Sequence, residues 1–306
     1  MVAKEYPGTL LEFEHWFRTD EACRDYLAQL RWPQGFECPQ CRHKVAWRTK
    51  RGLYCCTSCK AATSVTAGTT FERSRLPLRS WFRAAWWLTN QKSGINALSL
   101  QRLLGLGSYE TAWLCLHKLR RAMVRPGREL LSGRVEVDET LVGGLTKGNP
   151  SRHKKMVVII AVEVKGAGMG RIRLQKIPDS TEPSITAFVR KSVATGSELI
   201  TDGSHAYKHL IPHGYTHHRN VLQHRGREAS NAMLPRVHRI ASLLKRWLLG
   251  IHQGRVSRHQ MDHYLNEFAF RFNRRLSPRR GMLFYRLMQQ CVAVPAAPYS
   301  EVVGST

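Results

Sequence analysis

Three side chains that can coordinate a divalent metal ion stand on three separate predicted elements. Asp138 lies on a predicted strand, Asp202 directly follows a second strand, and His238 lies near the start of a predicted helix. Lys245 follows His238 by seven positions, so these two side chains are two helical turns apart. Two carboxylates and a third ligand from distant elements are what a metal-dependent phosphoryl-transfer site needs, and the lysine can point at a phosphate.

Each of these residues also has an ordinary structural interpretation. An aspartate at a strand end often forms a turn, and a single histidine on a helix is often a surface or core residue. The residues taken together, at this spacing, favour a site. If His238 is not a ligand, Glu228, Asp262 and Glu267 are the remaining candidates for the third position. For Glu267 we prefer an i,i+4 ion pair with Arg271 on one helix.

A histidine as the third ligand predicts how the site responds to metal and to pH. The neutral imidazole of His238 carries no charge, so the site holds two negative charges where three carboxylates hold three. Nitrogen is a softer ligand than oxygen, which predicts looser Mg2+ binding and a relative gain with Mn2+. Because only neutral histidine coordinates a metal, activity is expected to fall as the pH drops through about 6.5.

The elements that must position these side chains lie beyond residue 133. The segment from Arg134 to Gly144 alternates as a strand does, and it places Glu136, Asp138 and Thr140 on one face. If the strand before Asp202 pairs with this one, both acids come within reach of one pair of metal ions. The further predicted elements are strands over 156–164 and 171–177, a helix over 182–193, a strand over 197–201, and a helix from Pro235 to Gly250.

The net charge predicts a polyanionic partner. The chain has 48 Lys and Arg against 22 Asp and Glu, which gives a formal net charge of +26. Each basic side chain that neutralises a phosphate releases condensed counterions, so nucleic acid is the first candidate. The alternative is a solvated basic surface that only keeps the protein soluble, and so one-sided a charge is an unusual way to achieve that.

The apolar segments of the chain argue against a membrane protein. The longest apolar run, 156–162, is far too short to cross a bilayer, and the N-terminal residues lack the apolar core of a secretory signal. We therefore expect a soluble, intracellular protein with no membrane partner.

Two C-x2-C pairs predict a structural zinc site. Cys38 and Cys41 form the first pair, and Cys56 and Cys59 form the second. Four thiolates can close tetrahedrally around Zn2+ and leave no open position for a substrate. Disulfides are the alternative, but the expected compartment disfavours them. Cys55 is a substitute for Cys56, although the C-x2-C spacing favours Cys56.

Residues 77–124 predict a set of helices that includes a helix-turn-helix. A short helix over 97–104 is followed by a turn at Gly105-Leu106-Gly107, and Ser108 can cap a second helix over 109–123. Beside a zinc ribbon and this net charge, the pattern favours DNA binding over simple packing of a helical hairpin. The basic residues on the second helix are His117, Lys118, Arg120 and Arg121.

Motifs along nearly the whole chain resemble, in order, those of one known family. They are Gly68-Thr-Thr-Phe71 behind the cysteine pairs, Leu103-Leu-Gly-Leu-Gly-Ser-Tyr-Glu-Thr-Ala-Trp113, His117-Lys-Leu-Arg120, Val137-Asp-Glu-Thr140 with Gly143-Gly144, Thr201-Asp-Gly203, Leu234-Pro-Arg-Val-His238, and Glu267-Phe-Ala-Phe-Arg-Phe-Asn-Arg-Arg275. On these motifs the chain resembles the transposases of the insertion-sequence 1595 family, which are bacterial enzymes of the DDE type.

The resemblance implies an α/β architecture with a ribonuclease H-like catalytic domain, in which helices flank a mixed sheet, preceded by a zinc ribbon and a helix-turn-helix. The expected parts are an N-terminal helical segment over 1–32 with one helix from residue 8, the ribbon over 33–72, the helix-turn-helix over 77–124, the catalytic domain over 133–290, and a flexible tail over 291–306.

The resemblance also assigns roles to the site residues. Asp138 and Asp202 correspond to the first two catalytic acids of the family, His238 falls at the position of the third, and Lys245 matches the basic residue seven positions later. The implied cofactors are two Mg2+ or Mn2+ ions beside the structural Zn2+. The implied partner is double-stranded DNA, at transposon ends and target, with a homodimer or higher multimer assembled on it. We expect such an enzyme in the cytoplasm of a prokaryotic cell, at the nucleoid.

Two other functions compete with a transposase that cleaves the ends of its element and joins the 3′-OH ends to target DNA. A catalytically inactive DNA-binding regulator, derived from such an enzyme, would keep the ribbon and the helix-turn-helix but would not need Asp138 or Asp202. A nuclease of the same fold fits less well, because two candidate DNA-reading modules precede the catalytic domain.

Overall fold

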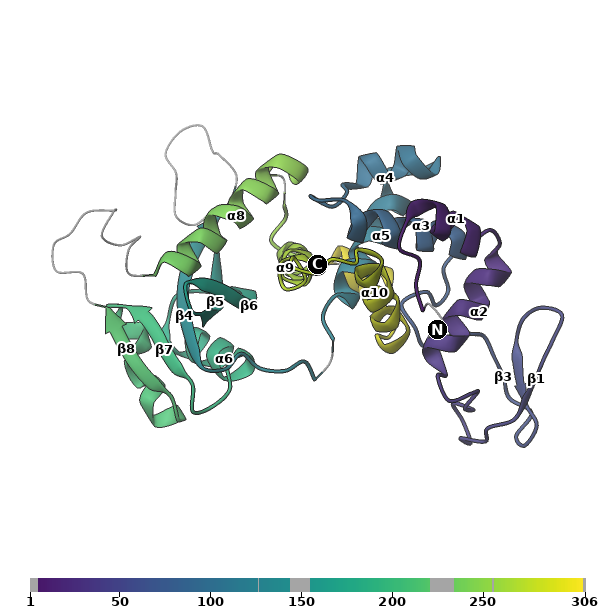
Figure 1. Cartoon of the computed structure of the whole chain (residues 1–306), viewed down its shortest axis with the longest axis horizontal. Helices are drawn as coiled ribbons and strands as arrows, with labels where there is room; N and C mark the ends of the chain where they lie inside the picture. The colour runs from purple at the N-terminus through teal and green to yellow at the C-terminus, as the bar shows by residue number, and fades with distance from the viewer. Residues whose placement is uncertain (1–4, 126, 144–154, 221–233, 255, 305–306) are drawn as a thin grey trace. The chain divides into compact units, whose positions relative to one another are not determined.

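The computed structural model describes residues 5–125, 127–143, 155–220, 234–254 and 256–304. The chain forms two compact units, which we describe separately. One unit contains residues 1–126 together with 276–306, and the other contains residues 127–275 (Figure 1). Within the described ranges, no helix is both long enough and apolar enough to cross a membrane.

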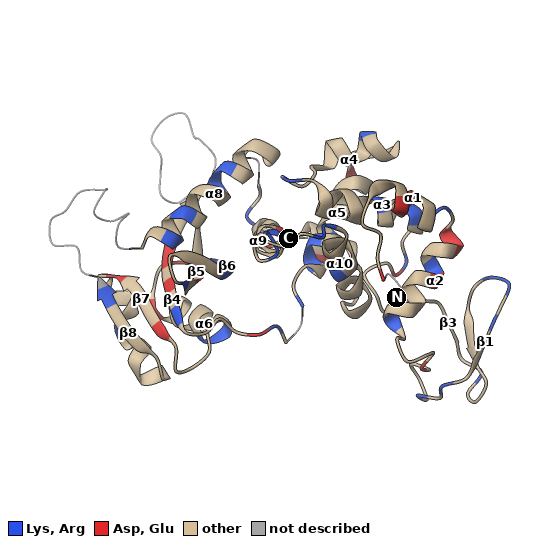
Figure 2. Cartoon of the chain, in the orientation of Figure 1, with Lys and Arg blue, Asp and Glu red and all other residues tan. Residues whose placement is uncertain are grey.

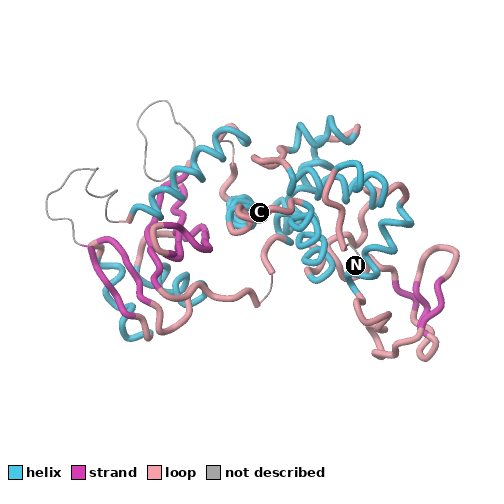
Figure 3. Tube along the Cα trace, viewed as in Figure 1, coloured by secondary structure: helices cyan, strands magenta, loops and turns pink. Residues whose placement is uncertain are grey.

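A mixed five-stranded sheet forms the centre of the unit over 127–275. Its strand order is β6-β5-β4-β7-β8, with β4, β5 and β6 antiparallel and with β7 and β8 parallel to β4. Figure 3 draws the strands in magenta. This order, a three-stranded meander extended by two parallel strands, is the topology expected of a ribonuclease H-like domain. The strands are β4 Arg134–Val142, β5 Met156–Lys165, β6 Gly168–Ile177, β7 Glu198–Asp202 and β8 Thr216–Asn220.

Helices cover both faces of this sheet, because its central strands are apolar on both sides. The helices α8 and α9 pack on the face that carries Val158, Ile160 and Ile172. The helix α6 and the 3-10 helix η2 pack on the opposite face, which carries Val135 and Val137 (Figure 1). These helical elements are α6 Glu182–Ser192, η2 His205–His213, α8 Pro235–His252 and α9 Met261–Phe272.

Side chains of α9 occupy the outer edge of β6. Asp262 accepts a hydrogen bond from the backbone N–H of Lys176, and Asn273 bonds both backbone groups of Ile172. An edge strand with free backbone groups invites pairing with another chain, so these contacts protect β6.

The second unit is helical and contains the zinc ribbon. Its core is a cluster of aromatic rings, packed mostly edge to face, in which Phe13, Phe17, Tyr26, Phe82 and Phe284 meet. Its elements are α1 Leu10–Trp16, α2 Asp20–Arg31, β1 Ala46–Arg48, β2 Tyr54–Cys56, β3 Ala62–Thr63, α3 Leu78–Asn90, α4 Ala97–Leu104, α5 Tyr109–Ala122, α10 Gly281–Ala293 and α11 Tyr299–Val303.

Several expected boundaries differ from the structure. The segment over 8–32 was expected to be one helix but forms two. The helix α1 has its C-cap at Phe17, and the side chain of Thr19 begins α2 by accepting a hydrogen bond from the N–H of Ala22. The last predicted helix runs past Gly250 to His252 before Gln253 adopts the left-handed conformation. The strand β8 was not predicted, since its residues lack apolar alternation.

The C-terminal segment also differs from expectation, because it belongs to the helical unit and not to the catalytic one. Phe284 of α10 is fully buried among the aromatic rings, and Thr70 N–H bonds the carbonyl of Cys291. Beyond residue 291 the short helix α11 buries Val302 instead of trailing as a flexible tail. The segment beyond residue 291 therefore contains buried apolar residues, although its Pro and Ala content had predicted disorder.

Candidate active site

Asp138 and Asp202 lie side by side on parallel strands, and both point to the α8 face of the sheet. The register pairs Glu136 of β4 with Ile200 of β7, so two residues further on Asp138 is level with Asp202. Even-numbered residues of β4 face α8, because Val142 belongs to that core while Val137 belongs to the other. The expected pairing of these two strands is confirmed.

The environment of Asp138 disfavours its charged form. Its pKa is raised to about 6, mainly because the carboxyl group is buried and also because of the negative charge of Asp202. A hydrogen bond from the N–H of Glu139 to Asp138 Oδ1 acts in the opposite direction. Two carboxylates that repel each other in a buried place need a cation beside them when both are ionised.

His238 extends from the first turn of α8 toward this pair. Its Nε2 lies 4.0 Å from Oδ2 of Asp138, and its side chain is half-buried. Lys245 is exposed on the same helix, two turns further along. Figure 2 shows acidic residues on β4 and Lys and Arg residues along α8.

A third carboxylate, which the sequence did not single out, stands next to Asp138. The hydroxyl of Tyr207, a fully buried side chain of η2, donates to Oε2 of Glu139 at 2.7 Å. Burial raises the pKa of Glu139 to about 7, and the charges of Asp138 and Asp202 add to the shift. Sequence alternation puts Glu139 on the other face of β4, which is why spacing alone gave no signal for it.

The oxygen and nitrogen donors of Asp138, Asp202 and His238 suit a hard divalent cation in chemical type. They are more widely spaced than a closed metal cage. Within the part of the chain that the structure describes, only the four ribbon cysteines bring three or more such ligand atoms within 4.8 Å of one another. The three residues therefore have suitable ligand types for a divalent cation but are not arranged as a closed metal cage.

The structure gives other roles to two of the alternative third residues. Asp262 holds the edge strand β6 through Lys176 N–H. Glu267 is fully buried on α9 and forms the expected i,i+4 ion pair with Arg271, with 3.9 Å between Oε1 and Nη1. Glu228 lies outside the described residues. Of these candidates in the described ranges, His238 alone approaches Asp138.

Cys38, Cys41, Cys56 and Cys59 form a site of the kind that holds structural zinc. Their sulfur atoms all lie within 4.8 Å of one another, and Cys55 is outside the group, as the C-x2-C spacing predicted. Backbone N–H groups that point at its sulfur lower the pKa of Cys38 to about 6, which favours the thiolate that binds metal.

The two cysteine pairs have the same backbone geometry. Arg42 N–H bonds the carbonyl of Cys38, and Lys60 N–H bonds the carbonyl of Cys56. Both Arg42 and Lys60 adopt positive φ, at 61° and 60°. Non-glycine residues rarely adopt this conformation, so its repetition marks two knuckles shaped for one tetrahedral ion.

The helices α3, α4 and α5 form as expected, and the Ser108 side chain caps α5 by accepting from Glu110 N–H. The basic residues of α5, which the sequence pattern connected with DNA binding, do not form one exposed face. His117 and Arg120 are buried in the helical core, and Arg121 forms an ion pair with Glu301. The exposed positions are the first turn of α5, at Tyr109, Glu110 and Thr111, and the end of α4, at Arg102 and Leu103.

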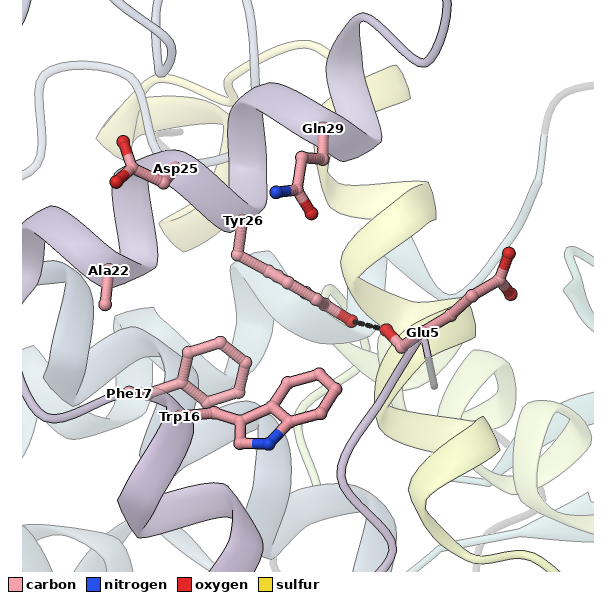
Figure 4. A pocket seen from close by; sticks show the side chains of 7 residues that line it. All are labelled: Glu5, Trp16, Phe17, Ala22, Asp25, Tyr26 and Gln29. Carbon is pink, nitrogen blue, oxygen red and sulfur yellow. Dashed lines mark hydrogen bonds between the residues drawn. The ribbon is translucent and has the colours of Figure 1, made fainter. Parts of the chain in front are cut away.

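A shallow pocket of about 400 Å3 lies on the helical unit and is lined only by residues between 5 and 29. Figure 4 shows Trp16, Phe17 and Tyr26 around it, with the Tyr26 hydroxyl donating to the carbonyl of Glu5 at 3.0 Å. Asp25 on its rim already pairs with Arg48. No residue of the catalytic unit lines this pocket, so it takes no part in the carboxylate site.

Comparison with known proteins connects both sites to mobile DNA elements. Residues 130–273 match the family model described as the ISXO2-like transposase domain, and residues 18–62 match the transposase zinc-ribbon domain. The chain is also 27% identical over 286 residues to a protein of Halobacterium salinarum described as an uncharacterized protein in transposable element ISH50. That match covers 83% of this chain and 91% of the relative.

Two solved structures have a distant likeness to the chain. One is a simian T-cell lymphotropic virus intasome in complex with PP2A regulatory subunit B56 gamma, with 13% identity over 65% of this chain and 72% of that one, and a TM-score of 0.34. The other is the Mos1 strand transfer complex, with 13% identity over 69% and 77% of the two chains and a TM-score of 0.30. TM-scores this low do not allow any property of these structures to be transferred to the chain.

Zinc content tests the assignment of the four cysteines. Cys41→Ser removes one thiolate of the tetrad, whereas Cys55→Ser changes a neighbour outside it. We expect the parent and Cys55→Ser to contain one zinc per chain and Cys41→Ser to contain much less, because a structural site needs all four ligands. The measurement is colorimetric zinc release after denaturation. Loss of zinc in Cys55→Ser, or full retention in Cys41→Ser, would show that the tetrad is wrong.

Proposed function

Because the chain belongs to the insertion-sequence 1595 family of transposases, we propose that it cuts the ends of a DNA insertion and joins them to target DNA through a site of Asp138, Asp202 and His238. The observation that carries the proposal is the meeting of these residues. His238 Nε2 lies 4.0 Å from Asp138, and Asp202 is level with Asp138 on the adjacent strand.

The three side chains divide the work of holding two divalent metal ions. Asp138 lies between the other two, so it would contribute to holding both ions, and Asp202 and His238 would supply the further ligands. When bound, the ions activate the attacking oxygen, of water in cleavage or of a DNA 3′-OH in joining, and stabilise the leaving oxygen. The mixed O and N donor set supports Mg2+ or Mn2+, with a relative preference for Mn2+ compared with an all-carboxylate site.

Positive charge along α8 supports DNA as the substrate. Arg239, Lys245 and Arg246 are exposed on the helix that also carries His238. A phosphate held by Lys245 would lie on the same side of the sheet as the carboxylates. Such contacts position the backbone without reading sequence.

Recognition of the DNA ends falls to the helical unit. The recognition helix of a helix-turn-helix contacts base edges through its N-terminal residues. In this chain those are Tyr109, Glu110 and Thr111, which are exposed, and Arg102 at the end of α4 is exposed beside them in the same hairpin. Cutting two ends of one element requires at least two active sites, so the working form is proposed to be a homodimer or higher multimer on DNA.

The inactive-regulator alternative explains the helical unit but not the carboxylates. A protein that only binds DNA has no use for buried acids whose charges raise the pKa of Asp138 and Glu139. Burial of uncompensated acids costs stability, so a chain free of catalytic demand would be expected to replace them. Their retention supports the enzyme.

The first test replaces the third ligand. His238→Ala is expected to reduce cleavage of a plasmid carrying the DNA that flanks the gene by at least about 100-fold, because loss of a ligand exceeds the 10–100-fold effect of outer-shell changes. The matched control is His209→Ala, a surface histidine of the same unit that pairs with Glu182. Gel analysis of cleaved ends and of joined pre-cut ends gives both rates.

The outcomes of this test separate the competing functions. Cleavage by His238→Ala at the parent rate would remove His238 from the site. A parent protein that binds this DNA but cuts none of it with Mg2+ or Mn2+ would be a regulator. Cleavage without joining of a pre-cut 3′-OH end would identify a nuclease.

A second test uses the raised pKa of Asp138. A carboxyl group with a pKa of about 6 holds its proton below that pH, and a protonated carboxyl does not coordinate a metal ion. Mn2+ affinity is therefore expected to be highest above about pH 7 and to fall as the pH drops through 6, by at least about tenfold per unit, because at least one proton must be displaced. The measurement is Mn2+ titration followed by electron paramagnetic resonance, with Asp262→Asn as a control that keeps the same profile. Equal affinity at pH 7 and pH 5 would contradict the assignment of Asp138.

A further inference from the structure

A buried glutamate on β4 caps the helix that carries His238. Glu136 is 2% exposed, and its Oε2 accepts hydrogen bonds from the backbone N–H groups of Arg236 at 2.8 Å and Val237 at 3.0 Å. Its Oε1 accepts from the guanidinium of Arg236 at 2.8 Å. One carboxylate thus binds two backbone donors and one charged side chain of the first helical turn.

The helix α8 has no cap from its own sequence. Its N-cap residue, Leu234, offers no side-chain acceptor, and Pro235 occupies the first turn. The N–H groups of a first helical turn have no partners inside the helix and need acceptors from elsewhere. Glu136 supplies that acceptor from the sheet, and its negative charge also suits the positive end of the helix dipole.

Arg236 connects the same place to a third element. Its Nε donates to the carbonyl of Gly168 at 2.9 Å and its Nη2 to the carbonyl of Gly166 at 2.7 Å. Gly166 lies in the turn between β5 and β6, and Gly168 is the first residue of β6. The guanidinium therefore fixes the start of α8 to β4 and to the β5–β6 turn at once.

These contacts lie immediately beside the metal-binding residues. Glu136 precedes Asp138 by two positions and shares its face of β4, and Arg236 and Val237 directly precede His238. A rotation or shift of the first turn of α8 would change the distance of 4.0 Å between His238 Nε2 and Asp138 Oδ2.

We propose that Glu136 and Arg236 are positioning residues that hold His238 at ligand distance from Asp138. The inference rests on the proposed function, because it assumes that His238 binds a metal ion. It adds that the position of the histidine is set by a carboxylate from another strand and not by the sequence of α8.

The chain offers a matched control for a merely structural role. Glu163 lies on the neighbouring strand β5 and is 3% exposed. It also accepts from two backbone N–H groups, those of Ser132 and Arg171, and it pairs with the guanidinium of Arg171. Glu136 and Glu163 are therefore alike in burial and in partners, but the hydrogen bonds and the ion pair of Glu163 go to Ser132 and Arg171 and not to α8.

The experiment combines Glu136→Gln with His238→Ala in a double-mutant cycle on the full chain. Mn2+ affinity is measured by electron paramagnetic resonance. Hydrogen exchange of the peptide over 235–240 is measured in metal-free protein. Glu136→Gln is expected to weaken Mn2+ binding by about tenfold, the lower end of outer-shell effects, and to speed exchange at the start of α8. Glu163→Gln is expected to change neither quantity.

The double-mutant cycle tests the proposal by comparing the effect of Glu136→Gln on Mn2+ affinity with and without His238. In the His238→Ala background, Glu136→Gln is expected to have no further effect on Mn2+ affinity. An equal loss in both backgrounds would show that Glu136 acts on Asp138 or on the fold, and would overturn the inference. Loss of affinity in His238→Ala but not in Glu136→Gln would overturn the inference and leave the proposed function intact. If His238→Ala binds Mn2+ as the parent does, the proposed third ligand fails, and the inference fails with it.

Arg236→Lys provides a second test in case the Glu136→Gln variant does not fold. It keeps the positive charge but loses the three-way contact of the guanidinium, because an ammonium cannot reproduce the planar fork. Weaker Mn2+ binding with an unchanged thermal unfolding temperature supports positioning. Unchanged Mn2+ binding together with faster exchange over 235–240 would contradict it.

Discussion

The hydrogen bonds of the buried Glu136 carboxylate to the first turn of α8 are the contact that connects the start of the His238 helix to the sheet. The sheet alone brings Asp138 beside Asp202, because β4 and β7 pair in parallel. It does not bring His238, which belongs to a helix that follows residues 221–233 in sequence. The apolar stripe of α8 packs on the sheet and sets the distance between helix and sheet. Glu136 binds the first turn of α8 and sets the position of that turn. Removing one partner of a buried ion pair leaves the other charge uncompensated and typically costs about 3–5 kcal/mol.

A second constraint is the concentration of negative charge in a strongly basic chain. With a net charge of +26, the protein could neutralise its acids with arginine, as it does at Glu163 and Glu136. It does not do so for Asp138, whose pKa is raised by burial and by Asp202. Carboxylates that lack an arginine partner in a buried place keep their affinity for a divalent cation. Among the described residues, acids on adjacent strands thus differ in their partners: Glu136 and Glu163 pair with arginine, whereas Asp138 lies beside Asp202 and His238.

Periodicity was enough to predict most of the catalytic unit. The alternation around Asp138, the helix from Pro235 and the strand before Asp202 are local patterns, and each appears where it was expected. Contacts that depend on three-dimensional packing were missed. The pairing of Tyr207 with Glu139 joins segments far apart in sequence, and the burial of His117 and Arg120 depends on how α5 packs in the helical unit. The placement of α10 with the N-terminal helices likewise follows from Phe284, whose aromatic partners lie at the other end of the chain.

The central claim is that one metal ion is bound by Asp138 and by a nitrogen of His238. The most direct measurement is electron spin-echo envelope modulation of Mn2+ bound to the full chain. The tetrad of the ribbon contains only sulfur ligands, so a histidine nitrogen coordinated to Mn2+ does not come from the ribbon, and the His238→Ala variant tests whether it comes from His238. The account predicts nitrogen modulation in the parent protein and in His209→Ala, and its loss in His238→Ala. Bound Mn2+ without nitrogen modulation in the parent, or with the same modulation after His238→Ala, would contradict it.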